Sequence, residues 1–135
     1  MMEKTPPDLI LFVCEHGAAK SVIAAAYFNK LAGERNVNVR AIARGTNPDQ
    51  KLSQKTIDGL ARDGLKSDER KPQKLTDTDN ESALQIISFC ELPYEDQYKA
   101  PIEQWDDVPP VSENYEKARD TIIQRINQLL NTKFN

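Results

Sequence analysis

Short apolar runs alternate with helix-like segments along this chain. A continuous apolar run over Leu9–Val13 is rich in branched residues, which predicts a strand that is covered on both faces, as in a parallel sheet. From Lys20 onward, apolar residues recur every four positions as far as Leu31, which predicts a helix that ends near Gly33. The first third of the chain therefore predicts a strand, a tight turn and a helix in direct succession.

Three further runs predict strands. Apolar and polar residues alternate over Val37–Ala43, which indicates a strand with one better-buried face near an edge of the sheet. Leu84–Phe89 predicts a third, buried strand, and a short fourth strand is expected near Ile102–Trp105. Four strands of this kind, separated by helices, predict a central and mainly parallel sheet.

Two more helices complete the pattern. Ser53 is predicted to cap a second helix that Gly64 closes, and Ser112 is predicted to cap a final amphipathic helix. The polar segment 66–80 between them is expected to be an exposed connection with about one turn of helix. The predicted fold class is a three-layer α/β/α domain with a four-stranded, mainly parallel sheet.

The turn after the first strand carries the candidate chemistry. A helix that starts directly after a strand gathers unpaired N–H groups and a positive helix end at one point, where an anion binds. Those N–H groups also stabilise a thiolate at Cys14, and the hydroxyl of Ser21 is placed to donate to it. Gly17 allows the backbone to approach a ligand closely. The alternative is a structural cysteine that ends a core strand.

The sequence CEHGAAKS in this turn resembles the phosphate-binding loop of the low-molecular-weight protein tyrosine phosphatases and of the related thioredoxin-coupled arsenate reductases. That loop consists of a cysteine, five residues, an arginine and a serine. Cys14 and Ser21 match it, whereas Lys20 stands in place of the arginine. The resemblance continues at the sequence GTNP from Gly45 and at a Trp-Asp pair before the last helix, and so spans nearly the whole chain.

The resemblance implies a phosphate-binding loop and a catalytic set. The loop residues would be Glu15, His16, Gly17, Ala18, Ala19, Lys20 and Ser21, and Cys14 would be the nucleophile that forms a phosphocysteine. Lysine keeps the positive charge at position 20 but lacks the planar fork with which arginine grips two phosphate oxygens. The side chain of His16, the only histidine, is expected to face solvent, with a contact to the thiolate or the substrate as the alternative.

The family also carries an Asp-Pro pair that protonates the leaving oxygen. An ungapped alignment places Pro109 at the position of this acid, and a slip of one or two residues brings Asp107 or Asp106 there instead. A general acid contributes typically about 10²- to 10⁴-fold in rate. The alternative is that both carboxylates lie in solvent or cap the helix.

A second cysteine ends the third strand. If the strands that carry Cys14 and Cys90 are neighbours, both thiols lie at the carboxyl edge of the sheet, where parallel sheets bind ligands. In the arsenate reductases a cysteine at this position attacks the nucleophilic cysteine, so Cys90 could complete a disulfide; the alternative is a core residue without a redox role. Arg44 is a candidate to face a bound anion or simply solvent. Tyr94 and Tyr98 could flank the mouth of the site or cover a loop.

Length and composition limit the number of domains, the classes of partner and the cellular location that we expect. A length of 135 residues fits one domain over residues 1–135, and a net charge of −3 with 29% charged residues indicates neither a nucleic-acid nor a membrane surface. Two cysteines argue against a disulfide scaffold and favour the cytoplasm. The expected ligand is phosphate or another tetrahedral oxyanion, carried by a phosphorylated protein or a small phosphoester. A thiol reductant is a further expected partner, and no metal or cofactor is expected.

Three functions remain open at this point. The first is a cysteine-dependent phosphatase that acts on a phosphate monoester such as phosphotyrosine. The second is an arsenate reductase that uses Cys14 and Cys90. The third is a non-catalytic, oxyanion-binding or regulatory domain in which Lys20 and Pro109 have removed efficient chemistry.

Overall fold

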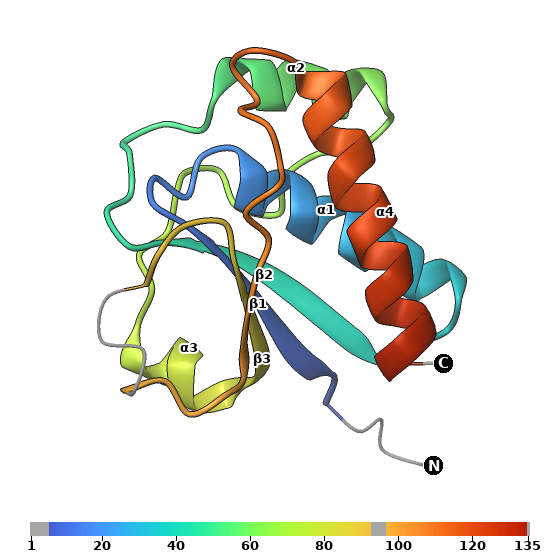
Figure 1. Cartoon of the computed structure of the whole chain (residues 1–135). Coiled ribbons are helices and arrows are strands. Elements are labelled where there is room, and N and C mark those ends of the chain that lie inside the picture. The colour runs from blue at the N-terminus through green and yellow to red at the C-terminus, as the bar shows by residue number, and fades with distance from the viewer. Residues whose placement is uncertain (1–5, 93–96, 135) are drawn as a thin grey trace.

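The computed structural model describes residues 6–92 and 97–134, in which strands and helices alternate (Figure 1). In chain order the elements are β1 (Asp8–Cys14), α1 (Lys20–Glu34), β2 (Val39–Gly45), α2 (Gln54–Arg62), α3 (Asp77–Ser82), β3 (Ala83–Ser88), β4 (Ile102–Gln104) and α4 (Tyr115–Lys133). No helix in the described part of the chain is long and apolar enough to cross a bilayer.

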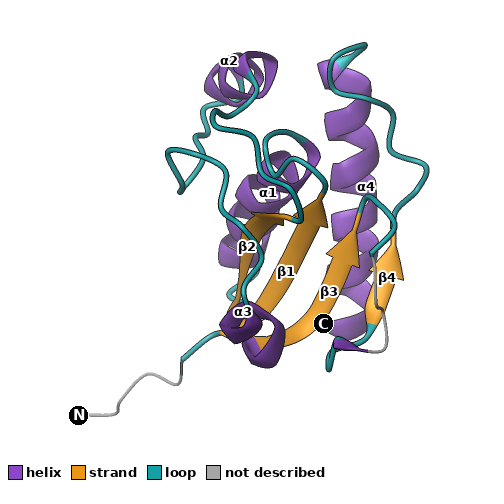
Figure 2. Ribbon diagram, turned by 90° about the vertical axis from the view of Figure 1, so that its left-hand side faces the viewer, coloured by secondary structure: helices purple, strands orange, loops and turns teal. Residues whose placement is uncertain are grey.

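The four strands form one sheet in the order β2-β1-β3-β4, and all pairs are parallel (Figure 2). The mainly parallel sheet expected from the sequence is confirmed, as are the edge position of β2 and the adjacency of β1 and β3. In the central strand β1 the four residues from Ile10 to Val13 are fully buried. This double coverage explains why the strand is an uninterrupted apolar run.

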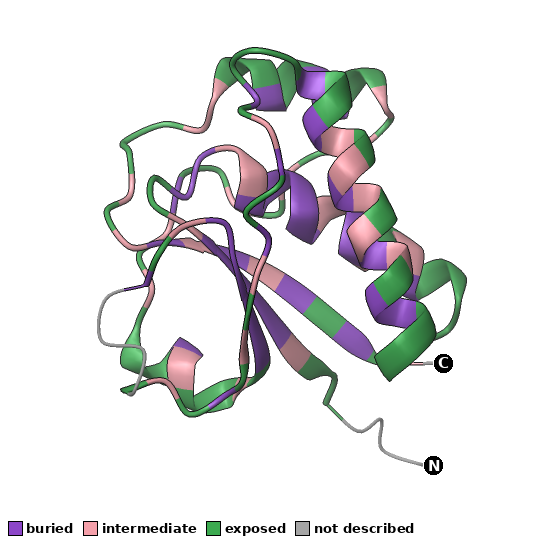
Figure 3. Ribbon diagram, in the orientation of Figure 1, coloured by how far each residue is buried: buried purple, intermediate pink, exposed green. Residues whose placement is uncertain are grey.

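The two faces of the sheet are covered unequally. Ile10 and Phe12 belong to a large core that is shared with α1 and α4, whereas Leu11 and Val13 belong to a smaller core that includes residues of the segment after β3. This alternation follows from the two-residue period of a strand. Helices α1 and α4 lie on one side of the sheet and α3 on the other (Figure 2), and Figure 3 shows buried residues along the strands and along α1 and α4. The second helical layer of the predicted α/β/α arrangement is therefore thin, because α3 has only 6 residues.

Aromatic rings fill the larger core. The ring of Phe12 lies 5.6 Å from that of Trp105 and 6.0 Å from that of Phe28, measured between centroids. Trp105 directly follows the edge strand β4 and is buried, as is Phe89 directly after β3. The cluster fixes the segments that follow β3 and β4 against β1, next to the candidate loop.

The N-cap residue of α2 is the one predicted from the sequence, whereas that of α4 is not. Ser53 caps α2 by accepting a hydrogen bond from the N–H of Thr56 at 3.3 Å. The predicted cap of the last helix at Ser112 is wrong, because Asn114 accepts the capping hydrogen bond from the N–H of Lys117 at 3.0 Å. Ser112 lies in the preceding turn. Both residue types are good caps, and only the chain path into α4 selects between them.

The polar segment 66–80 and the start of β3 also differ in detail from expectation. The helical turn expected within the polar segment is α3, which starts at Asp77 and carries a capping box formed by Thr76 and Asp79. The third strand begins at Ala83 rather than at Leu84, and Leu84 is 47% exposed. The apolar run of this strand therefore extends past the covered part of the sheet.

A partly buried polar cluster ties α1, α2 and α4 together. The carboxylate of Asp63, directly after α2, accepts hydrogen bonds from the hydroxyls of Tyr27 at 2.5 Å and Tyr115 at 2.9 Å. The guanidinium of Arg119 donates to the same carboxylate at 3.1 Å. Burial acts to raise the pKa of Asp63, but these three donors together lower it. The cluster positions α2, whose cap Ser53 reaches the candidate loop.

Replacing Gly59 with alanine should destabilise the protein. A methyl group at this position in α2 would overlap the ring of Tyr115. We expect a loss of about 1 to 3 kcal/mol in the free energy of unfolding from overpacking, despite the better helix propensity of alanine. Urea denaturation checks this expectation. An unchanged midpoint would show that the Tyr115 ring moves aside freely.

Candidate active site

The turn between β1 and α1 is held from behind by the loop 46–53. Four of its carbonyl groups accept hydrogen bonds from N–H groups of that loop. The pairs, with the carbonyl first, are Cys14 with Thr46 at 3.2 Å, Glu15 with Asn47 at 2.8 Å, His16 with Asp49 at 3.0 Å, and Ala18 with Ser53 at 3.0 Å.

These bonds orient the N–H groups of the turn. In a trans peptide the C=O group and the following N–H group point in opposite directions. The N–H groups of residues 15, 16, 17 and 19 therefore point away from loop 46–53, and within the described residues none of them donates to another backbone group. The turn thus presents a concave set of free main-chain donors, which is the arrangement that binds anions.

Two glycines make this close approach feasible. Gly17 has a φ of 61°, in the left-handed region that glycine adopts without strain. A Cβ atom on Gly17 would lie 2.9 Å from the backbone nitrogen of Gly45, and a Cβ atom on Gly45 would lie 2.8 Å from the nitrogen of Gly17. The candidate loop and the end of β2 are therefore in direct backbone contact.

Cys14 and Ser21 meet at the start of α1. Their Sγ and Oγ atoms lie 3.0 Å apart, Ser21 is fully buried, and Cys14 is a free thiol. The N-cap residue of α1, Ala19, provides no side-chain cap, so the N–H groups of the first turn stay available. The positive end of the helix dipole thus lies beside the sulfur, where it favours a bound anion.

A cavity of about 400 Å³ opens over this loop. Cys14, Lys20 and Cys90 all line it, so the structure brings together three of the side chains singled out in the sequence. Its lining further includes Glu15, His16, Ala18 and Ala19 from the loop, and Asp49, Ser53, Phe89, Pro110, Val111 and Ser112. Sequence reasoning missed these last six, although the match at GTNP pointed to the neighbourhood of Asp49.

Cys90 shares the cavity with Cys14. It follows β3, the direct neighbour of β1, and its backbone N–H donates to the hydroxyl of Ser88 at 3.2 Å. Burial raises the pKa of the Cys90 thiol, and Cys14 and Glu15 act in the same direction, whereas Ser88 and Lys20 oppose them. Cys90 is therefore a protonated thiol at neutral pH.

The raised pKa of Cys90 predicts slow alkylation. In a Cys14→Ser variant, the reaction of Cys90 with iodoacetamide should accelerate with pH and reach half its maximal rate at a higher pH than free cysteine does, because only the thiolate reacts. Mass spectrometry of samples quenched at several pH values checks this. A midpoint at or below that of free cysteine would contradict the effect of burial.

The candidate acids lie away from the cavity. Asp107 forms an ion pair with Arg125 of α4 at 2.6 Å, and this contact lowers the pKa of Asp107. Neither Asp106 nor Asp107 lines the cavity; Pro110 does instead. The segment before α4 thus brings Pro110, Val111 and Ser112, and no carboxylate, to the space over Cys14.

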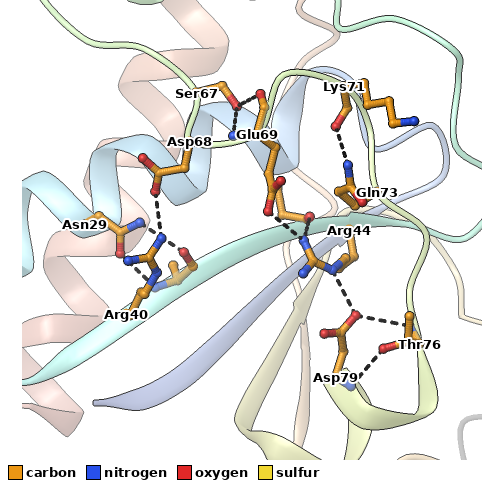
Figure 4. A network of polar contacts seen from close by, with 12 residues as sticks. Asn29, Arg40, Arg44, Ser67, Asp68, Glu69, Lys71, Gln73, Thr76 and Asp79 are labelled. Atoms are coloured by element: carbon orange, nitrogen blue, oxygen red, sulfur yellow. Dashed lines mark hydrogen bonds and ion pairs between the residues drawn. The ribbon is translucent and has the colours of Figure 1, made fainter. Parts of the chain in front are cut away.

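Arg44 is held within the protein framework (Figure 4). Its Nε donates to Asp79 at 2.9 Å, and its guanidinium lies 3.5 Å from the carboxylate of Glu69. With 15% of its side chain exposed, it neutralises two carboxylates at the end of β2 and does not line the cavity. Arg44 therefore faces neither open solvent nor the cavity over Cys14.

Two tyrosines were predicted to lie near the mouth of the site, and the structure describes only one of them. Tyr98 packs with the smaller core, close to Cys90, and does not line the cavity. Tyr94 lies outside the described residues. Over residues 6–92 and 97–134 no cluster of three or more histidine, cysteine or acidic residues is arranged to hold a metal ion.

Comparison with models of known protein families shows to which family the chain belongs. The model of the family described as low molecular weight phosphotyrosine protein phosphatase matches residues 9–133. The chain belongs to this family. No match is found among curated protein sequences.

Solved structures of the phosphatase and reductase branches share the fold. An arsenate reductase from Archaeoglobus fulgidus is 25% identical, with a TM-score of 0.73 over 90% of this chain and 98% of that one. YwlE from Bacillus subtilis is 18% identical, with a TM-score of 0.82 over 95% and 99% of the two chains. A low molecular weight protein tyrosine phosphatase from T. tengcongensis is 18% identical, with a TM-score of 0.78 over 92% and 98%. Membership of the family and this fold support a cysteine-based phosphatase or arsenate reductase.

Proposed function

We propose that this family member is a phosphatase that hydrolyses phosphate monoesters, phosphotyrosine among them, through a phosphocysteine at Cys14. The observation that carries the proposal is the turn whose carbonyls are tied back to loop 46–53, which leaves main-chain N–H groups free around Cys14. Such preorganised donors stabilise the charge that develops on the equatorial oxygens of a transferring phosphoryl group.

The proposed reaction has two steps. The Cys14 thiolate attacks phosphorus, a P–S bond forms, and the P–O bond to the leaving group breaks as the leaving oxygen takes up a proton. Water then attacks the phosphocysteine, releases phosphate and regenerates the thiolate. Ser21, whose Oγ lies 3.0 Å from Sγ, stabilises the thiolate by hydrogen bonding whenever sulfur carries the charge.

Lys20 provides the positive charge for the phosphoryl group in this proposal. It is the first residue of α1, it lines the cavity, and within the described residues its ammonium group has no ion pair. As a point charge it neutralises the anion without the bidentate geometry of a guanidinium.

Replacing Lys20 with arginine should therefore raise activity. The added charge-assisted hydrogen bond is worth roughly 1.5 to 3 kcal/mol, which corresponds to an increase of about 10- to 100-fold in kcat/KM for p-nitrophenyl phosphate. A Lys20→Ala variant should fall below the unaltered protein because the charge is lost. Equal values for lysine, arginine and alanine would show that this side chain does not reach the anion.

An arsenate reductase is the second candidate, and Cys90 in the same cavity favours it. Cys14 would bond to arsenate with loss of water, and Cys90, after its thiol has lost its proton to solvent, would then attack the sulfur of Cys14. A disulfide forms, the two electrons of the S–As bond pass to arsenic, and arsenite leaves; a thiol reductant restores both thiols. The 25% identical reductase from Archaeoglobus fulgidus adds support.

One set of assays on the full chain separates these functions from a non-catalytic oxyanion-binding domain. Phosphate release from aryl phosphates supports the phosphatase. Arsenate-dependent loss of two thiols that disappears in Cys90→Ser supports the reductase. Protection of Cys14 from alkylation by inorganic phosphate, without turnover of either substrate, supports the binding domain. Two free thiols in one cavity also fit the reducing environment of the cytoplasm, where we propose that the protein acts.

A further inference from the structure

A histidine and an aspartate meet at the mouth of the cavity. Nδ1 of His16 lies 3.1 Å from Oδ1 of Asp49, and the backbone N–H of Asp49 donates to the carbonyl of His16 at 3.0 Å. Nε2 of His16 lies 3.7 Å from Oε2 of Glu15. The imidazole is thus held in place by one direct contact with Asp49, and its other nitrogen lies close to a second carboxylate.

His16 and Asp49 lie at the surface, whereas the sulfur of Cys14 contacts the protein interior. The side chains of His16 and Asp49 are 56% and 53% exposed, whereas Ser21, in contact with the Cys14 sulfur, is fully buried. All of the cavity residues concerned, Cys14, His16 and Asp49, line the same space. In an in-line displacement the leaving oxygen lies opposite the attacking sulfur, on the side of the open mouth.

We propose that His16 is the catalytic acid of the phosphatase reaction and that Asp49 is its positioning residue. This proposal rests on the proposed phosphatase function and adds the group that supplies the proton. Nε2 of the imidazolium gives its proton to the leaving oxygen as the P–O bond breaks. The neutral imidazole then takes a proton from the water that attacks the phosphocysteine, which returns His16 to its starting state.

Side-chain chemistry and placement favour His16 over the other groups of the chain. An imidazole exchanges protons between pH 5 and 8 without special tuning, and a general acid of this kind contributes typically about 10²- to 10⁴-fold. Each imidazole nitrogen faces a carboxylate, Nδ1 that of Asp49 and Nε2 that of Glu15, and the closer contact with Asp49 fixes the orientation of the ring. Asp107 is bound to Arg125 at 2.6 Å and does not line the cavity.

The test compares good and poor leaving groups. p-Nitrophenolate leaves without much help from an acid, whereas phenolate needs a proton. We expect His16→Asn to lose at least about 10²-fold in kcat/KM for phenyl phosphate and far less in kcat/KM for p-nitrophenyl phosphate, because kcat/KM reports only the steps up to the departure of the leaving group. Added imidazole should restore the phenyl phosphate activity of His16→Ala, an effect that a purely structural role would not produce.

Asp49→Asn tests the positioning role. It should reduce kcat/KM for phenyl phosphate more than kcat/KM for p-nitrophenyl phosphate, and by less than His16→Asn does. Asp68→Asn is the matched control, because Asp68 is 61% exposed, pairs with Arg40 at 3.3 Å and does not line the cavity. This control should leave the ratio of the two rates unchanged.

Two results would overturn the proposal while leaving the phosphatase function intact. One is an equal loss of kcat/KM for both substrates in His16→Asn. The other is a selective loss of phenyl phosphate activity in Asp106→Asn or Asp107→Asn, which would assign the acid to the segment before α4. If the unaltered protein turned over neither substrate, the phosphatase function and the role of His16 would both be rejected.

Discussion

Cys14→Ser is expected to reduce the hydrolysis of p-nitrophenyl phosphate by at least about 10³-fold. Serine keeps the size and the contact with Ser21, but a hydroxyl is far less acidic than a thiol, so serine is a much weaker nucleophile near neutral pH. The measurement is kcat at saturating substrate for both proteins. This change has the largest expected effect because every proposed chemical step passes through this sulfur.

The fold and the anion site should survive this substitution. The N–H groups that face the ligand belong to the backbone, which serine leaves unchanged, so phosphate should still bind to Cys14→Ser in calorimetry. The melting temperature should stay close to that of the unaltered protein. Undiminished turnover in Cys14→Ser would place the reaction at a different residue.

Gly17→Ala is expected to disrupt the loop itself. Alanine at a φ of 61° costs about 1 to 2 kcal/mol, and its Cβ would lie 2.9 Å from the backbone nitrogen of Gly45. Since the end of β2 is hydrogen-bonded on both sides, the loop has to move instead, and a displacement near 1 Å costs about 10²-fold in rate. We expect that loss in kcat/KM together with a lower free energy of unfolding.

Gly33→Ala is the matched control for this substitution. Gly33 lies near the end of α1, and a Cβ atom there would meet nothing within 4 Å. The same chemical change should therefore stabilise the protein by about 0.5 to 1 kcal/mol through helix propensity and leave activity unchanged. If both alanine variants behaved alike, the contact between Gly17 and Gly45 would not limit activity.

The sequence predicted local features of the fold correctly where the hydrophobic pattern, or the choice of capping residue, allowed a single interpretation. The run Leu9–Val13 predicted a doubly covered strand because a central parallel strand has no solvent-facing side. Ser53 was identified correctly as a cap. The cap of α4 was assigned to Ser112 instead of Asn114, because two good capping residues lie two positions apart and the sequence does not reveal which one meets the helix axis.

The part of the candidate site that the sequence predicted consists of residues whose proximity follows from local structure. Cys14, Lys20 and Ser21 are close in the chain, so a strand followed directly by a helix brings them together. Cys90 required only the adjacency of two parallel strands. The positions of Asp107 beside Arg125 and of Asp49 beside His16 depend on loop paths and on side chains from distant elements, which no local period encodes.

The sequence by itself determined a parallel α/β domain with a thiol at the junction of its first strand and helix, because hydrophobic periodicity and a short turn act over neighbouring residues. Only the tertiary structure decided which way the peptide groups of that turn face, since loop 46–53 binds their carbonyls from far along the chain. It also decided which proton donors reach the cavity, because long-range packing, rather than local propensity, sets the distance between loops that do not adjoin in sequence.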